Sequence, residues 1–65
     1  GPYAVRIWKR DGSRNFMDLA AAAENVKRIA QDEEIRRASL KEITAALEQG
    51  EEIETPLAVF AAWDG

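Results

Sequence analysis

Thr55-Pro56-Leu57-Ala58-Val59-Phe60-Ala61-Ala62-Trp63 is the longest stretch of this chain without a charged residue. Its last seven side chains, residues 57–63, are all apolar, so both sides of the segment must be covered by the rest of the chain or by a second copy. A short apolar run of this kind is typical of a strand buried on both faces. A helix is the alternative, with Thr55 as its N-cap and Pro56 at its first position. The alternation of polar and apolar residues over 52–57 favours the strand.

The N-terminal segment has the pattern of a β-hairpin. Residues 3–9 alternate and are rich in β-branched and aromatic side chains, which predicts a strand. Asp11-Gly12 within residues 10–13 supplies the backbone conformations of a tight turn. Residues 14–17 then form a short return strand, for which we expect Phe16 to be the anchor in the core.

Two amphipathic helices are predicted between this hairpin and the last strand. Asp18 is a suitable N-cap for a helix over residues 19–30, whose small apolar side chains recur at helical spacing. Ser39 and Glu42 form the pattern of a capping box at the start of a second helix. Gly50 ends this second helix, because glycine readily takes the left-handed conformation of a C-terminal cap.

These elements predict an α+β domain in the order ββααβ, with a three-stranded antiparallel sheet and two helices on one face. The alternative is a hairpin followed by three helices. We expect a break between the helices over residues 31–39, where Asp32 either caps a short extra turn or lies in a continuous helix. Gly1-Pro2 is typical of a residue pair left by tag cleavage, and residues 3–65 form the single domain.

Composition excludes several kinds of site. The 65 residues include no cysteine and no histidine, which removes disulfides, thiolate metal sites and the usual general base. We therefore expect no metal, no cofactor and no catalysis. No segment approaches the roughly 20 apolar residues of a membrane span, so we expect a cytoplasmic protein that binds no membrane and no small-molecule substrate. A chain of this size has a thin margin of stability, which makes a homodimer a reasonable expectation.

The N-terminal hairpin carries a set of basic and aromatic residues. These candidate partner-binding residues are Arg6, Trp8, Arg10 and Arg14. Cations beside aromatic rings hold single-stranded nucleic acid in many proteins. The simpler interpretation is that Trp8 packs under another layer while the arginines make a bare sheet face soluble. The acidic net charge of −3 favours the simpler interpretation.

The C-terminal half carries the opposite charge. Residues 1–31 hold six basic and three acidic residues, whereas residues 32–65 hold three basic and nine acidic residues. The acidic candidates for partner binding are Glu48, Glu51, Glu52 and Glu54. Such a stretch can dock on a basic protein surface, although acidic loops are also common simply because they are well solvated.

The sequence thus predicts a non-catalytic protein–protein interaction module, a small acidic inhibitor or adaptor that docks on a larger protein, for example one that handles nucleic acid. A nucleic-acid-binding protein that uses the basic hairpin is one alternative. A self-associating unit is the other, in which the last strand pairs across a two-fold axis. The residues expected to carry self-association are Leu57, Val59, Phe60 and Trp63.

Overall fold

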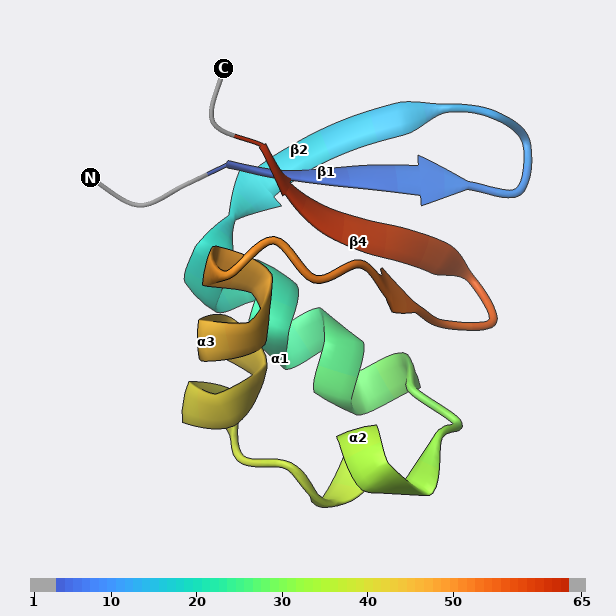
Figure 1. The fold of residues 1–65 in the computed structure, drawn as a ribbon. Helices are drawn as coiled ribbons and strands as arrows, with labels where there is room; N and C mark the ends of the chain where they lie inside the picture. Colours follow the sequence, from blue (N-terminus) through green and yellow to red (C-terminus); the bar gives the residue numbers. More distant parts are fainter. Residues whose placement is uncertain (1–3, 64–65) are drawn as a thin grey trace.

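The computed structural model describes residues 4–63, and for Ala4 and Arg6 it describes the backbone alone. Four strands form one antiparallel sheet in the order β2-β1-β4-β3, and α1 and α3 lie on one side of it (Figure 1). The elements are β1 (Ala4–Lys9), β2 (Arg14–Asp18), α1 (Leu19–Ile29), α2 (Glu33–Arg37), α3 (Leu40–Glu48), β3 (Ile53–Glu54) and β4 (Ala58–Trp63). The α+β class is confirmed. The predicted strand start at Tyr3 and the pair Gly1-Pro2 lie outside the described residues.

The prediction of a three-stranded sheet is wrong, because the acidic segment before the last strand forms a strand of its own. Thr55 reverses the chain between β3 and β4: its backbone N–H and its hydroxyl both donate to the carbonyl oxygen of Ala58, at 2.9 and 2.7 Å. The backbone N–H of Ala58 donates back to the Thr55 hydroxyl at 3.1 Å. Pro56 follows Thr55 in this turn, where its fixed φ suits the position. The alternation over 52–57 therefore belongs to a hairpin and not to one long strand.

The prediction of two helices is also wrong, because the break contains the short helix α2. Asp32 caps it by accepting hydrogen bonds from the backbone N–H groups of Glu34 and Ile35, at 2.9 and 3.3 Å. At the other end, the Lys27 side chain on α1 donates to the Arg36 carbonyl oxygen at 2.9 Å. A positive charge near the exposed carbonyls of a helix end is favourable. The possibility that Asp32 caps an extra turn is thus the one observed.

The helix caps predicted at Asp18, Ser39 and Gly50 are confirmed. Asp18 accepts a hydrogen bond from the backbone N–H of Ala21 at 2.8 Å and caps α1. The Ser39 hydroxyl accepts from the Glu42 N–H at 3.1 Å, and the Glu42 carboxylate accepts from the Ser39 N–H at 3.0 Å, which completes the capping box of α3. Gly50 follows α3 with φ of +90°, a conformation that favours glycine.

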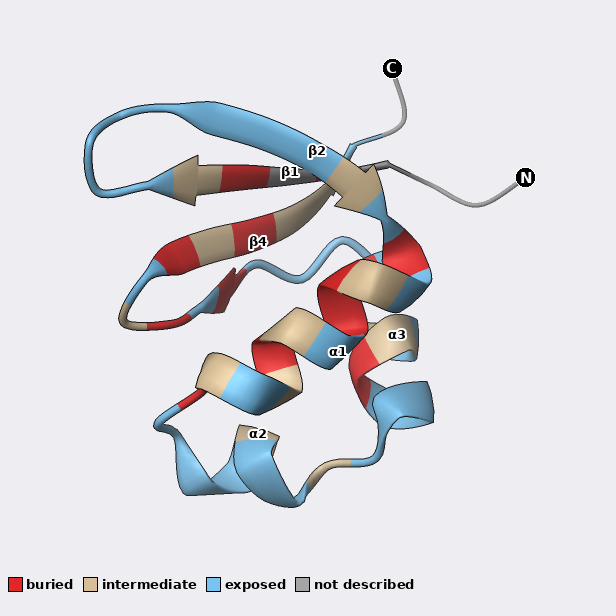
Figure 2. Ribbon diagram, turned by 180° about the vertical axis from the view of Figure 1, so that it is seen from behind, coloured by how far each residue is buried: buried red, intermediate tan, exposed pale blue. Residues whose placement is uncertain are grey.

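The last run is a strand and not a helix, which excludes the alternative of a hairpin followed by helices alone. β4 lies inside the sheet, paired with β1 along its whole length and with β3 at Val59 and Phe60. Alternate residues of the sheet point at the helices and are buried (Figure 2). The buried core consists of Val5, Ile7, Leu19, Ala22, Ala23, Val26, Ile43, Leu47, Ile53, Ala58 and Phe60. None of the helices within residues 4–63 is long and apolar enough to cross a membrane.

Candidate functional site

One face of the sheet has no helix over it in the described part of the chain. Because Val5 and Ile7 point into the core, Trp8 on the same strand points to the other side. The register of the four strands assigns the remaining members of this surface, since directly paired residues share a face. We call this surface the open face, and its described side chains are Trp8, Arg14, Phe16, Asp18, Glu54, Val59, Ala61 and Trp63.

Two aromatic rings meet on the open face. Phe16 on β2 and Trp63 on β4 have ring centroids 4.9 Å apart and planes tilted by 47°. β1 lies between these two strands, so the rings meet above it. Phe16 is nevertheless 53% exposed and Trp63 39% exposed, which is unusual for large apolar side chains with a defined neighbour. The open face therefore presents an ordered aromatic pair to solvent.

The expectation that Phe16 anchors the core is wrong. Phe16 pairs directly with Arg6 in the β1–β2 ladder and therefore lies on the face opposite to Val5 and Ile7. The core position on β2 belongs to Met17, which pairs with Val5 and packs against the core cluster. The length of the Asp11-Gly12 turn determines this register, so tracing the ladder back from the turn would have revealed it.

The predicted basic and aromatic residues of the hairpin do not form one patch. Arg14 is exposed on the open face, beside the half-buried Trp8. Arg10 instead reaches the β3–β4 turn, where its Nε donates to the carbonyl oxygen of Pro56 at 3.1 Å. This contact joins the two hairpin turns at one end of the sheet. The side chain of Arg6 lies outside the described part of the structure.

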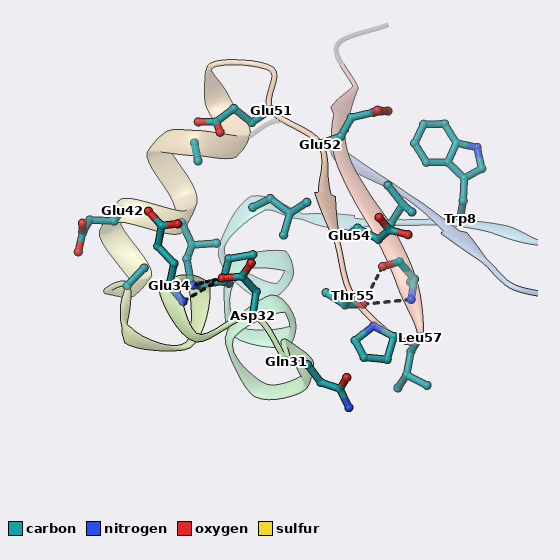
Figure 3. A pocket seen from close by; sticks show the side chains of 18 of the residues that line it. Trp8, Gln31, Asp32, Glu34, Glu42, Glu51, Glu52, Glu54, Thr55 and Leu57 are labelled. Carbon is teal, nitrogen blue, oxygen red and sulfur yellow. Dashed lines mark hydrogen bonds between the residues drawn. The ribbon is translucent and has the colours of Figure 1, made fainter.

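Most of the predicted acidic residues meet around a hollow that is open to solvent. It lies between α2, α3 and β3, and its rim reaches Trp8 (Figure 3). The acidic residues that line it come from three parts of the chain and are Asp32, Glu34, Glu42, Glu51, Glu52 and Glu54. Three cations, Lys9, Arg10 and Arg37, line it as well. Glu48 is exposed at the end of α3 and is not among the residues of this lining.

Within residues 4–63, two carboxyl groups have a shifted pKa, and each shift has a structural cause. The Ser39 backbone N–H, followed by its hydroxyl, lowers the pKa of Glu42 below its ordinary value. The hydroxyl and backbone N–H of Ser13 lower the pKa of Asp11 in the hairpin turn. Both carboxylates therefore serve local structure. Among residues 4–63, no cluster of three or more acidic side chains has the arrangement to hold a metal ion.

The four residues that were expected to carry self-association lie in three different environments. Phe60 is only 2% exposed and belongs to the core of its own protomer. Val59 and Trp63 lie on the open face, whereas Leu57 is 61% exposed in the turn that joins β3 to β4. Because β3 already pairs with Val59 and Phe60, this part of β4 offers no free strand edge.

No protein-family model, curated protein or solved structure matches this chain. Functional inference therefore depends on the geometry and charge of the two surfaces described above, the open face and the acidic hollow.

Proposed function

We propose that this protein is a non-catalytic protein–protein interaction module that binds another protein chain through the open face. The observation that carries the proposal is the Phe16–Trp63 pair, which lies exposed on a sheet face without a helix over it. Rigid aromatic side chains that keep their orientation lose little entropy on binding, and they are frequent at the centres of protein interfaces. The site thus offers a preformed apolar anchor.

The charges of the open face favour a protein over a nucleic acid. Its described charged side chains are Arg14 and Asp18 on β2 and Glu54 at the β3 edge, which are one cation and two anions. Binding of a phosphate backbone requires an excess of cations, and the whole chain carries a net charge of −3. A surface with an apolar centre and mixed charges at its edges corresponds to the usual anatomy of a protein interface.

The acidic hollow supports the more specific role of an inhibitor or adaptor. Acidic side chains from α2, α3 and the β3 segment gather on the side of the molecule that adjoins the β3 edge (Figure 3). Concentrated charge of one sign accelerates encounter with a basic surface and orients it. We propose that the hollow attracts a basic region of a larger protein, such as one that handles nucleic acid, in a contact separate from the one that the open face makes.

The test compares three immobilised proteins in nuclease-treated lysate. They are the wild type, the double variant Phe16→Thr/Trp63→Thr, and Leu57→Thr as a control, since Leu57 is also an exposed apolar residue but lies in the β3–β4 turn. Threonine is β-branched and therefore suits both strand positions. We expect proteins that are retained by the wild type and the control to be lost from the double variant. Retention of the same proteins by the double variant would overturn the proposal.

Nucleic acid remains the second candidate, because exposed aromatic rings on a sheet can stack with bases. Its test is a titration of a labelled single-stranded oligonucleotide at several salt concentrations. Binding that weakens steeply with salt and is lost in Phe16→Thr/Trp63→Thr would favour this candidate over a protein partner.

A further inference from the structure

One row of side chains crosses the entire open face. Arg14 on β2 pairs with Trp8 on β1, Trp8 pairs with Val59 on β4, and Val59 pairs with Glu54 on β3. Directly paired residues lie at the same level along the strands and on the same face. The row therefore begins with a cation at one edge of the sheet and ends with an anion at the other edge, with two apolar side chains between them.

This order of charges is self-complementary under one two-fold rotation. If two open faces meet and the axis runs parallel to the strands, β2 of one copy lies opposite β3 of the other. Arg14 then faces Glu54 of the second copy twice, and Trp8 faces Val59 twice, as a symmetric interface requires. An axis in the same plane but perpendicular to the strands would instead bring Arg14 onto Arg14 and Glu54 onto Glu54.

The geometry points to a second copy of this chain as the partner of the open face, in a face-to-face dimer whose axis runs along the strands. The inference rests on the proposed function, since it names the protein that occupies that surface. The aromatic pair fits this arrangement: Phe16 and Trp63 lie on one side of the charged row, and rotation about this axis brings both pairs to the same end of the interface. Packing of two sheets with nearly aligned strands is common in proteins.

The size of the face determines how tightly such a dimer would hold. The two central strands have six residues each, whereas β2 has five and β3 two. The four-stranded face therefore measures at most roughly 20 by 19 Å, or about 350–400 Å² per copy before side-chain relief is counted. Specific interfaces usually bury at least about 1,200 Å² in total. The dimer is therefore expected to be weak, with a dissociation constant in the micromolar to millimolar range, and to depend on protein concentration.

Charge reversal tests the orientation directly. Sedimentation equilibrium from about 1 μM to 1 mM would be measured for the wild type and for Arg14→Glu, Glu54→Arg and the double variant Arg14→Glu/Glu54→Arg. Each single reversal places like charges together twice, so we expect association to weaken at least tenfold. The double variant exchanges the two ends of the row and should associate within a few-fold of the wild type. Glu24→Arg on the exposed side of α1 is the control and should leave association unchanged.

A mixture of the two single variants provides the sharpest readout. Arg14→Glu has two anionic ends and Glu54→Arg two cationic ends, so each should be monomeric alone while their equimolar mixture associates. Association of the mixture cannot arise from unfolded variants. Circular dichroism would verify that each single variant is folded.

The inference is overturned if the wild type stays monomeric, if single reversals do not weaken the dimer, or if neither the double variant nor the mixture restores it. A monomeric wild type that still captures proteins through Phe16 and Trp63 would refute the inference and leave the proposed function intact. A monomeric wild type without such capture would overturn both.

Discussion

Leu47 is the residue whose truncation should damage this fold most clearly. It lies on α3, is fully buried, and belongs to the core cluster between the helices and the sheet. Leu→Ala substitutions at such sites cost about 2.7–5.0 kcal/mol, because transfer energy is lost and a cavity remains. A domain of this length has a total stability of roughly 3–10 kcal/mol. Leu47→Ala should therefore remove about a quarter or more of the free energy of unfolding.

The same helix provides a matched control. Leu40 is the first residue of α3 and is 42% exposed, so Leu40→Ala removes the same atoms without opening a cavity. We expect the control to change stability by less than about 1 kcal/mol. Urea unfolding would be followed by far-ultraviolet circular dichroism at low micromolar concentration, with thermal unfolding as a second measure. Leu47→Ala should lower the melting temperature by at least about 10 °C. Equal costs for Leu47→Ala and Leu40→Ala would refute this account of the core.

The aromatic pair and the capping box give two further predictions. A double-mutant cycle with Phe16→Thr and Trp63→Thr should yield a coupling energy of about 0.5–1.5 kcal/mol in urea unfolding, and additive effects would contradict the observed ring contact. The second prediction concerns pH. Because the Ser39 amide lowers the pKa of Glu42 in the folded state, this stabilisation is complete at neutral pH and is lost as the pH falls through that folded-state pKa. At pH 7 the melting temperature of the wild type should exceed that of Glu42→Gln, and the difference should shrink as the pH falls into the acid range. A difference in melting temperature that does not change with pH would contradict the proposed role of the Glu42 carboxylate.

Local signals predicted the element ends well, because each depends on a few neighbouring residues. The carboxylate of Asp18, the hydroxyl of Ser39 and the missing side chain of Gly50 act within one helical turn of their positions. Asp32 carried the same signal for α2, but five residues are too few for a hydrophobic stripe to show. Asp32 is therefore predictable as a cap from the sequence, whereas the helix that follows it is not.

The prediction that the segment before β4 continues into one long strand is wrong, because alternation of polar and apolar residues indicates a strand but does not show where that strand ends or with which strand it pairs. Alternation over 52–57 is correct for a strand as far as Glu54, yet Thr55 then uses its hydroxyl to close a turn onto Ala58. A side chain that hydrogen-bonds to nearby backbone competes with a continuing ladder. As a result Leu57 lies in an exposed turn, and β4 gains a second neighbouring strand.

The sequence by itself determined the α+β class, the caps and the strand character of the last run, since these follow from local hydrogen bonding and hydrophobic period. Only the tertiary structure decided the site. It placed Phe16 against Trp63 across an intervening strand, and it aligned Arg14 and Glu54 at opposite ends of one row. It also gathered acidic residues from α2, α3 and β3 around one hollow. The physical reason is that strand order and register bring together residues far apart in the chain, and no local preference encodes that pairing.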